Sequence, residues 1–372
     1  MKKNTLSAVS LFSGAGGMDV GFVSAGFEVL VANDIDRDAC ATYERNHSGK
    51  VIEGDLVGQQ HLLKGYEGVD VLFGGPPCQG FSVAGKMDPN DERSKLLLTF
   101  FDIVDLLKPT AFVCENVKAL AQLEKWSGIR QEILARTSGE YNVVMVVLAA
   151  NDFGVPQKRE RVFCIGIHKS RGALSKDAFD SLARSMLERE KRPAETVRQV
   201  IQSMGRAGSA GNESICNARI TFARSPVLRK SPYAGMLFNG AGRPLSAKGY
   251  ASTLPASMGG NKTPIVDEGE IFDGQPSFVE EYHRGLMAGA TPRVGYAPER
   301  LRRLTVAECL RFQTFPETYS LAGRQSAKYR QIGNAVPSKL AEAVAKVVRD
   351  LLAQESLLTA AERMNAMQVA AE

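Results

Sequence analysis

The chain has 372 residues, of which 44% are hydrophobic and 23% charged, and its net charge is +5 at pH 7. These values are typical of a soluble globular protein with two or three domains and a sizeable core. No apolar run is long enough to cross a bilayer, and the basic N-terminus runs straight into a Gly-rich loop, so we predict neither a membrane helix nor a signal peptide.

The six cysteines are scattered and never form a Cys-x-x-Cys pair, and most lie in apolar stretches. This pattern argues against a disulfide framework or a zinc cluster. We therefore expect no metal site and a reducing, cytoplasmic setting.

The first 170 residues alternate apolar runs with helical periodicity. Helix 94–107 is typical, with Leu97, Phe101, Val104 and Leu107 near one face. Continuous apolar strands between amphipathic helices predict an α/β fold with a doubly wound, mostly parallel sheet, in which ligands bind at the carboxyl ends of the strands. The predicted strands cover residues 8–12, 28–32, 69–73, 111–114, 143–148 and 162–167.

After His168 this rhythm breaks. A charged helical segment over 176–204 leads into a Gly-, Ser-, Pro- and Arg-rich region that we expect to be irregular, mostly loop and strand, as far as residue 298. Helices are predicted again at 305–312 and at 338–352, the latter capped by Ser338, and the tail after Gln354 as frayed helix. We therefore predict three parts: 1–170, a smaller domain 171–298, and a segment 299–372 that returns to the first domain.

Positive charge is concentrated between residues 201 and 262, where eight lysines and arginines stand against Glu213 alone. A basic face suits a polyanion, because each neutralised phosphate releases counterions. An ordinary solvated surface explains the charge equally well. The cations are Arg206, Arg219, Arg224, Arg229, Lys230, Arg243, Lys248 and Lys262.

A Gly-rich loop, residues 13–17, follows the first predicted strand and precedes a helix. In a dinucleotide fingerprint the third glycine would stand where this chain has Asp19, so the loop favours a nucleoside ligand without a pyrophosphate, or a plain structural turn. Asp34 ends the second predicted strand and could accept both ribose hydroxyls of that ligand, and Asp55 offers a second carboxylate near the same crevice. Each carboxylate could instead cap a turn.

Cys78 follows Gly74-Gly75-Pro76-Pro77 at the end of the 69–73 strand. A thiol on such a stiff turn, where substrates bind, fits a nucleophile better than the usual small buried hydrophobe, a role that suits Cys40, Cys114 and Cys164. The polar loop from Ser82 to Arg93 looks able to close over a substrate.

Glu115 ends the next strand, as either a helix cap or a general acid. Arg159 and Arg161 alternate into the last strand and so should share one face. They could be solvated charges, or could pair with a thiolate, with Glu115 or with a phosphate.

In order along the chain, these motifs resemble those of the DNA (cytosine-5) methyltransferases of prokaryotic restriction-modification systems. The resemblance covers nearly all of the chain outside 170–300, and six motifs in order make it very specific. They are Phe12-Ser13-Gly14-Ala15-Gly16-Gly17, Pro76-Pro77-Cys78-Gln79, Glu115-Asn116-Val117, Gln157-Lys158-Arg159-Glu160-Arg161-Val162, Arg303-Leu304-Thr305 through Gln313-Thr314-Phe315-Pro316, and Gln331-Ile332-Gly333-Asn334-Ala335-Val336-Pro337.

The resemblance implies an S-adenosylmethionine-dependent methyltransferase fold and a catalytic mechanism. The thiolate of Cys78 attacks C6 of a flipped-out cytosine, Glu115 engages N3, and C5 takes the methyl group from S-adenosyl-L-methionine. Arg161 helps to hold the base's O2 and the cysteine, and Arg159 supports the site.

The resemblance also implies a set of cofactor residues. Phe12 lies on the adenine, the glycines lie near the methionine portion, and Asp34 takes the ribose hydroxyls. Ile35 stands where a bulky aromatic is common. The full set is Phe12, Gly14, Gly16, Gly17, Asp34, Ile35, Asp55, Leu56, Pro77, Asn334 and Val336.

By the same resemblance, region 171–298 is a target-recognition domain that reads duplex DNA from the major groove. Thr253-Leu254 resembles a Thr-Leu pair common in such domains. The predicted DNA-binding residues are Gln79, Ser82, Arg224, Arg243, Thr253 and Lys262.

Three alternative functions fit the sequence less well. A tRNA cytosine-5 methyltransferase shares the catalytic motifs, but its Cys-Phe-Thr signature is missing from this sequence. A catalytically silent DNA-binding homologue would be expected to lose the cysteine, the glutamate or the arginines, and a nicotinamide dehydrogenase would need the third glycine. Because no large N-terminal region precedes the motifs, we expect a compact microbial modification enzyme that acts as a monomer.

Overall fold

The computed structural model describes residues 5–77, 92–210, 212–354, 356–359 and 361, without the side chains of 92–95. The chain forms two compact units. The first comprises residues 1–153, 160–192 and 338–372, and the second comprises residues 154–159 and 193–337. Each unit is described by itself below.

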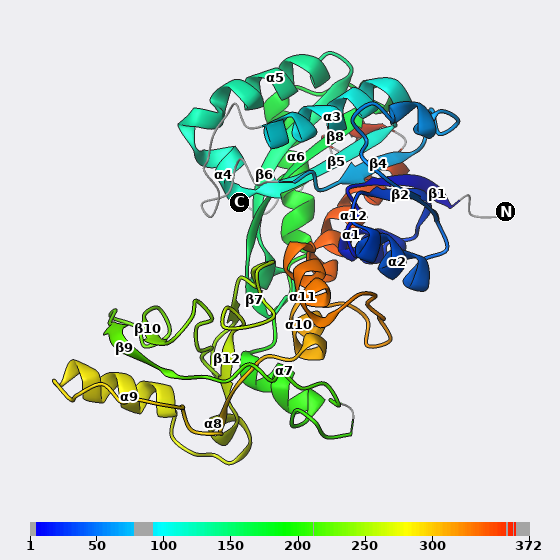
Figure 1. Ribbon diagram of the computed structural model, residues 1–372. Helices are drawn as coiled ribbons and strands as arrows, with labels where there is room; N and C mark the ends of the chain where they lie inside the picture. Colours follow the sequence, from blue (N-terminus) through cyan, green and yellow to red (C-terminus); the bar gives the residue numbers. More distant parts are fainter. Residues whose placement is uncertain (1–4, 78–91, 211, 355, 360, 362–372) are drawn as a thin grey trace. The chain divides into compact units, whose positions relative to one another are not determined.

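A seven-stranded sheet forms the centre of the first unit (Figure 1). All of its strands are parallel except β8, which runs antiparallel to both β5 and β6. The strand order reverses direction between β1 and β4, as in doubly wound sheets. In spatial order the strands are β3 (Lys50–Glu53), β2 (Phe27–Asp34), β1 (Leu6–Leu11), β4 (Val71–Gly74), β5 (Ala111–Val117), β8 (Glu160–His168) and β6 (Tyr141–Ala149).

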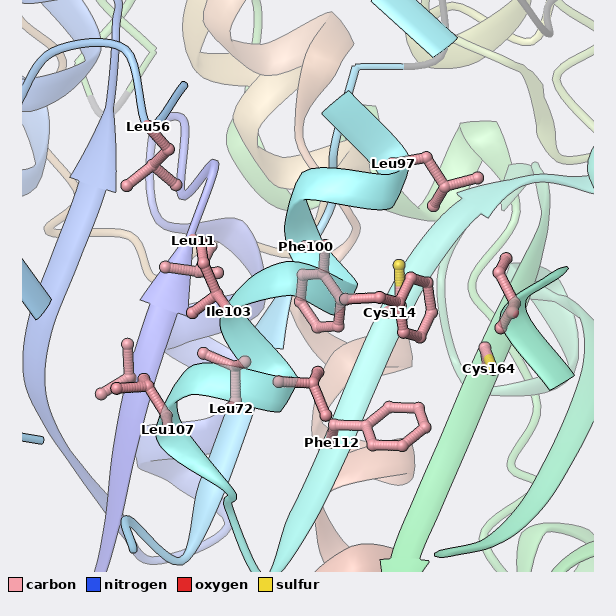
Figure 2. Packing of buried hydrophobic residues seen from close by; sticks show 14 of the residues in the cluster. Leu11, Leu56, Leu72, Leu97, Phe100, Ile103, Leu107, Phe112, Cys114 and Cys164 are labelled. Atoms are coloured by element: carbon pink, nitrogen blue, oxygen red, sulfur yellow. The ribbon is translucent and has the colours of Figure 1, made fainter. Parts of the chain in front are cut away.

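Helices cover both faces of this sheet (Figure 1). On one face, Figure 2 shows Phe100, Ile103 and Leu107 of α3 turned toward Leu72 and Phe112 of the sheet, and all five are fully buried. On the other face, helix α12 packs on α1 and α6. The helices of this unit are α1 (Gly17–Ser24), α2 (Arg37–Asn46), α3 (Glu92–Leu107), α4 (Lys118–Gln122), α5 (Ser127–Thr137), α6 (Lys176–Arg189) and α12 (Ser338–Ala353).

The second unit is built from short strand pairs and short helices. Its apolar cluster gathers Phe222, Phe238 and Tyr282 beside Ile265 and Leu301. Its strands are β7 (Gln157–Lys158), β9 (Phe222–Val227), β10 (Met236–Phe238), β11 (Ala251–Ser252), β12 (Ile265–Asp267) and β13 (Leu301–Arg303). Its helices are α7 (Val197–Met204), α8 (Glu268–Phe272), α9 (Phe278–Met287), α10 (Val306–Phe312) and α11 (Gln325–Asn334).

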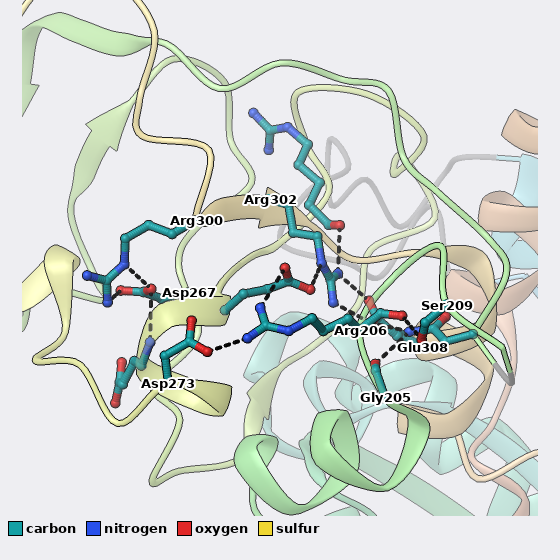
Figure 3. Close-up of polar contacts among 12 residues, drawn as sticks. Gly205, Arg206, Ser209, Asp267, Asp273, Arg300, Arg302 and Glu308 are labelled. Carbon is teal, nitrogen blue, oxygen red and sulfur yellow. Dashed lines mark hydrogen bonds and ion pairs between the residues drawn. The ribbon is translucent and has the colours of Figure 1, made fainter.

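Ion pairs link the short elements of the second unit (Figure 3). The Arg302 guanidinium lies 2.7 Å from both Glu268 and Glu308, and Glu308 is fully buried. Arg300 binds both oxygens of Asp267, at 2.6 and 2.9 Å. These pairs bind strand β13 to helices α8 and α10, and the segment just before β13 to strand β12.

The predicted α/β fold is confirmed, and each of the six predicted strands overlaps an observed one. Strand β3, only four residues long, was missed. The helical segment 176–204 is two helices rather than one, because Pro193 interrupts it and Thr196 caps α7. Helix α9 lies in a region expected to be irregular.

The predicted capping role of Ser338 is wrong. Ser338 is itself the first helical residue of α12, and its buried hydroxyl has no hydrogen-bond partner within the described part of the chain. By contrast, the helix predicted at 305–312 begins with a capping box, in which Thr305 and Glu308 bond to each other's backbone amides.

The boundaries of the two units differ from the predicted domain boundaries. Residues 299–337 belong to the second unit, because β13 pairs with β12 and the Tyr329 hydroxyl donates to the Leu304 carbonyl at 2.7 Å. Only the segment from Ser338 onward belongs to the first unit. Among the described residues, no helix is both long and apolar enough to span a membrane.

Candidate active site

The carboxyl ends of three neighbouring strands meet where the strand order reverses. Leu11, the last residue of β1, is paired with Gly74 at the end of β4, and Gly74 is paired with Cys114 of β5. The next residues on these strands are Phe12, Gly75 and Glu115. Such an edge is where ligands bind in doubly wound sheets.

A carboxylate and a guanidinium face each other at this edge. Arg161 Nε lies 2.8 Å from Glu115 Oε1, and the two side chains are only 15% and 10% exposed. The antiparallel register brings them together, because β8 pairs Val117 with Arg161. Arg161 also donates to the Glu160 carbonyl at 2.8 Å, which fixes the orientation of its guanidinium.

The turn after β4 lies against Glu115. A Cβ placed on Gly75 would come within 3.0 Å of Glu115 Oε2, so a side chain there would push the carboxylate away. Asn116 donates from Nδ2 to the Pro76 carbonyl at 3.2 Å, and its Oδ1 accepts from the Val117 amide at 2.9 Å. Asn116 therefore holds the turn next to the Glu115–Arg161 pair. The sequence alone does not indicate this role, although Asn116 lies in a recognised motif.

Three predicted site residues, Cys78, Gln79 and Ser82, lie outside the described residues. The chain is described up to Pro77, one residue before Cys78.

The cysteines that the structure describes differ in burial. Cys40, Cys114, Cys164 and Cys309 are buried, and burial raises the pKa of Cys40 and of Cys164 to about 12. Burial also raises the pKa of the Cys114 and Cys309 thiols well above the usual value. Such thiols stay protonated near neutral pH and are poor nucleophiles. The predicted packing role of Cys40, Cys114 and Cys164 is confirmed.

The Gly-rich loop after β1 has a constrained backbone. Phe12 has φ 52°, a value uncommon outside glycine, and Gly14 and Gly16 have φ 54° and 76°. The Gly14 amide donates to Asp34 Oδ2 at 2.7 Å, which ties the loop to the end of β2. Strain in such a loop often accompanies a binding site.

Asp34 keeps acceptor capacity toward the loop. Its other oxygen accepts from the Asp36 amide at 2.8 Å, so each oxygen has one backbone donor and a further lone pair. Burial raises the pKa of this carboxyl, although the hydrogen bonds from Asp36 and Gly14 lower it in part. Ile35, beside it, is 68% exposed, so an apolar side chain lies open next to a carboxylate.

The other predicted cofactor residues near β3 have different surroundings. Asn33 donates to the Ile52 and Gly54 carbonyls, both at 2.9 Å, and so fixes the segment that carries Asp55. Asp55 is exposed and accepts from the Val57 amide at 3.0 Å. The Leu56 side chain is buried in the hydrophobic core, which leaves only its backbone for a ligand.

Beneath the Gly-rich loop, Asp19 is fully buried on α1 and accepts from the Tyr43 hydroxyl at 2.9 Å. Burial raises the pKa of Asp19 to about 6, against the lowering effect of its hydrogen bonds. Asp36 caps α2 through the amides of Asp38 and Ala39.

Arg159 and Arg161 bind different partners. Arg159 is buried in the second unit and donates to the Gly333 carbonyl at 3.1 and 3.2 Å, and to the Leu254 carbonyl at 3.4 Å. It thereby holds two motifs that lie far apart in the sequence. Its predicted support of catalysis remains a prediction.

A buried pair of amides extends this arrangement. Gln157 Nε2 donates to Gln313 Oε1 at 3.1 Å, and Gln157 Oε1 accepts from the Leu254 amide at 3.0 Å. Gln313 in turn donates to the Ile332 carbonyl at 2.6 Å. Segment 255–256 passes close to Gly333. A Cβ on Gly333 would lie 2.4 Å from the Ala256 amide nitrogen. Four recognised segments therefore meet in the second unit.

The remaining predicted residues of the second unit lie as follows. Asn334, the last residue of α11, is exposed, and Val336 is buried. The Thr253 hydroxyl donates to the Lys158 carbonyl at 2.7 Å. Contact of Asn334 and Val336 with a cofactor, and of Thr253 with DNA, remain predictions.

The basic residues of the second unit divide into two groups. Arg206, although counted in the basic stretch, pairs with Glu268 at 3.6 Å and with Asp273 (Figure 3). Arg224, Arg243 and Lys262 are exposed, and no carboxylate of the described residues lies within ion-pair distance of them. The second group is therefore available to a polyanion.

The sequence of the chain matches the model of the family described as C-5 cytosine-specific DNA methylase over residues 6–350. The chain belongs to this family. This DNA cytosine-5 methyltransferase carries the Glu115–Arg161 pair on the central sheet of its first unit. Its second unit carries Arg224, Arg243 and Lys262, which form no ion pair with any described residue. Within the described residues of this methylase, no group of three His, Cys, Asp or Glu side chains is arranged to hold a metal ion.

Relatives of known type are similar over most of the methylase. The Type II methyltransferase M.FnuDI of Fusobacterium nucleatum is 30% identical over 349 residues, which cover 93% of this chain and 95% of that protein. The Type II methyltransferase M1.HphI of Haemophilus parahaemolyticus is 31% identical over 356 residues, covering 92% and 87%.

Solved structures share the fold of the methylase. The S. pombe Dnmt2 methyltransferase has a TM-score of 0.65 at 17% identity, covering 94% of this chain and 100% of that chain. The Entamoeba histolytica methyltransferase EhMeth has a TM-score of 0.64 at 16% identity, covering 95% and 100%.

Proposed function

We propose that this methylase transfers a methyl group from S-adenosyl-L-methionine to C5 of a cytosine flipped out of a specific duplex DNA sequence, through a covalent bond between Cys78 and C6. Family membership and the Type II relatives support the reaction and a role in restriction-modification. The observation that carries the mechanism is the Glu115–Arg161 pair beside the turn that leads to Cys78.

The chemistry has to overcome the low nucleophilicity of cytosine C5. In the proposed mechanism the Cys78 thiolate adds to C6, and the electron pair of the C5–C6 double bond makes C5 nucleophilic. After C5 has been alkylated, C5 loses its proton, the C5–C6 double bond re-forms and the sulfur leaves as thiolate. Cys78 suits this role because four of the five described cysteines are buried and have a raised pKa.

Glu115 and Arg161 would act together on the base. In its protonated form Glu115 can donate to N3, which draws electrons into the ring as the sulfur adds. Arg161 holds Glu115 at 2.8 Å and can donate its remaining hydrogens to O2 of the base. Because this pair is nearly buried, the hydrogen bonds act at low dielectric, where they are strong.

The donor set beside β1 and β2 fits S-adenosyl-L-methionine. Asp34 offers two acceptor oxygens to the vicinal ribose hydroxyls, and the exposed Ile35 offers an apolar surface to the adenine. When bound, S-adenosyl-L-methionine supplies an electrophilic methyl group. The predicted contacts from Phe12, Gly14, Gly16, Gly17, Asp55, Leu56, Pro77, Asn334 and Val336 belong to this proposal.

We further propose that region 171–298 recognises DNA and that Arg224, Arg243 and Lys262 contact it, together with Gln79, Ser82 and Thr253. Among the residues that the structure describes, none forms an ion pair with these three cations, which supports this role. We place the enzyme in the cytoplasm as a monomer, because the described cysteines are free and one chain carries every residue named for catalysis.

Transfer of labelled methyl from S-adenosyl-L-methionine tests the reaction. Unmethylated duplex DNA and tRNA are offered separately to the wild type and to Cys78→Ala. We expect label on cytosine C5 of the DNA with the wild type, and none with the variant. Label on tRNA alone would replace the proposed function by the tRNA alternative, and full DNA labelling by Cys78→Ala would disprove the covalent mechanism.

A further inference from the structure

We infer that Arg219, stacked on Tyr296, reads a guanine of the recognition sequence. The inference rests on the proposed function and adds a specificity-determining residue to it. Arg219 lies just before β9 in the second unit, and it is exposed. The Arg219 Cζ lies 5.0 Å from the centre of the Tyr296 ring.

Backbone hydrogen bonds fix the segment that carries Tyr296, the ring under Arg219. Segment 295–297 runs antiparallel to segment 220–222, with Thr221 bridged to Tyr296. The Phe222 amide donates to the Gly295 carbonyl at 3.0 Å, and the Ala297 amide donates to the Ile220 carbonyl at 2.9 Å. Below this ladder, Ile220 and Phe222 belong to the apolar cluster of the unit. The backbone of Tyr296 is therefore held in place within the unit.

The stacked pair has no evident task in stabilising the unit. Tyr296 is 64% exposed, so its ring covers little of the core. Arg206 also stacks on a ring, that of Phe272, but it is engaged by Glu268 and Asp273. Arg293 lies over Phe278 and the buried Tyr282, and so covers the apolar cluster. Among the described residues no carboxylate forms an ion pair with Arg219, which leaves its donors open.

These features match what base reading requires. An arginine presents two parallel N–H donors that fit O6 and N7 of guanine in the major groove, the commonest specific protein–DNA contact. Stacking fixes the guanidinium plane in advance, so less side-chain freedom is lost on binding. Arg224, Arg229 and Lys230 follow nearby and are exposed, and none of them lies over an aromatic ring of the described part of the chain. Flexible cations of this kind suit phosphates, which position the protein without reading sequence.

The exposed Val294 strengthens this assignment. It is 80% exposed and lies two residues before Tyr296 on the same segment. An apolar side chain beside a base-reading arginine can contact the edge of a neighbouring base pair, such as a thymine methyl.

The test selects duplexes from a randomised library with the full-length chain and sequences the bound fraction. For the wild type we expect at least one position where guanine is preferred about tenfold or more. Arg219→Gln should abolish that preference and Arg219→Lys should weaken it, both leaving the other positions unchanged, because lysine can donate to guanine but lacks the planar, stacked guanidinium of arginine. Tyr296→Phe should keep the preference and Tyr296→Ala should weaken it several-fold.

Arg224→Gln is the matched control, because Arg224 is an exposed arginine of the same region that stacks on no ring of the described residues. It should bind all sequences more weakly, with a shallower salt dependence and unchanged base preferences. The inference is overturned if both Arg219 variants keep every preference of the wild type, if they weaken all sequences alike, or if the wild type shows no guanine preference.

Methyl transfer by the same preparations separates this inference from the proposed function. A wild type that selects guanine through Arg219 but transfers no methyl would refute the activity alone. A wild type that methylates DNA with preferences unchanged in both Arg219 variants would refute the inference alone.

Discussion

Different interactions stabilise the two units of this methylase. In the first unit, α3 and the sheet bury an apolar cluster in which Phe100, Phe101 and Phe112 are fully inaccessible. The second unit has a smaller apolar cluster and also buries charged side chains, with Arg303 at 1% and Glu308 at 0% exposure. Apolar packing is non-directional, whereas buried charges require specific partners. The second unit therefore depends on individual pairs to a degree that the first does not.

One pair of charged side chains in the first unit marks function. Glu115 and Arg161 sit at the edge of a mostly apolar sheet, beside the turn that leads to Cys78. Nothing in the packing of the sheet calls for an ion pair there. Buried ionisable pairs in such a position are more typical of catalysis than of stability.

The largest expected effect is on catalysis. Glu115→Gln keeps the size of the side chain and an acceptor for Arg161, but it removes the acidic proton. We expect kcat for methyl transfer to fall by about 10²- to 10⁴-fold, the usual range for loss of a general acid. The folded state should be retained, as measured by thermal unfolding.

The matched control for Glu115→Gln is Glu160→Gln, in the same sheet. Glu160 pairs with Lys118, and both side chains are largely exposed. Its loss should change kcat less than about twofold, because exposed pairs contribute little. Similar kcat losses in the two variants would contradict a catalytic role for Glu115.

The next effect tests how much the apolar cluster of the first unit contributes to stability. Phe112→Ala should lower the free energy of unfolding by about 3–5 kcal/mol, the usual result of emptying a buried aromatic site. The Phe112 ring contacts Phe101 and Tyr141, at centroid distances of 5.7 and 5.1 Å. Denaturant titration followed by circular dichroism measures the loss. A change below about 1 kcal/mol would show that the cluster adapts to the cavity.

The polar side of the comparison is tested by Arg302→Ala. This change leaves Glu308 fully buried without its guanidinium partner, and we expect a loss of about 3 kcal/mol, at the lower end of the range for breaking a buried pair. Arg284→Ala, which removes an exposed arginine of the same unit, should cost less than about 0.5 kcal/mol. Equal losses of the free energy of unfolding in Arg302→Ala and Arg284→Ala would show that the second unit does not depend on this buried pair.

The smallest effect is pH-dependent and concerns Asp19. Because burial raises its pKa to about 6 from 3.8, the folded state binds the proton more tightly than the unfolded chain does. The wild type therefore loses stability as the pH rises from about 4 to about 6, by at most about 3 kcal/mol. Asp19→Asn should lack this loss while still accepting from Tyr43.

The measurement is the free energy of unfolding of both proteins between pH 4 and pH 8. The difference between Asp19→Asn and the wild type should grow in favour of the variant up to about pH 6 and then level off. A difference independent of pH would show that Asp19 does not titrate in this range.

Much of the first unit could be predicted from the sequence, because apolar runs and helical periodicity report directly on burial. The positions of Asp34, Cys78 and Glu115 after strands were sufficient to propose a site at the sheet edge. The antiparallel direction of β8 brings Arg161 into an ion pair with Glu115. This direction could not be derived from the sequence, since periodicity carries no information on strand direction.

The second unit resisted prediction for a different reason. The Arg159–Gly333 contact joins residues 174 positions apart, and the Gln157–Gln313 contact joins residues 156 apart. Each depends on one side chain reaching one specific partner, and no local pattern encodes that. Helix α9 was missed because turn residues dominate the composition around it.

The central claim, that Cys78 bonds to the target base, is tested most directly by trapping the adduct. Duplex DNA that carries 5-fluorocytosine has fluorine in place of the C5 proton, which must leave before the sulfur can depart. With S-adenosyl-L-methionine present, the wild type should form a protein–DNA complex that survives denaturation, with Cys78 as the modified residue by mass spectrometry, and Cys78→Ala should form none. Turnover of wild-type protein on normal DNA without any trapped complex on the fluorinated DNA, or a complex that persists in Cys78→Ala, would contradict the account.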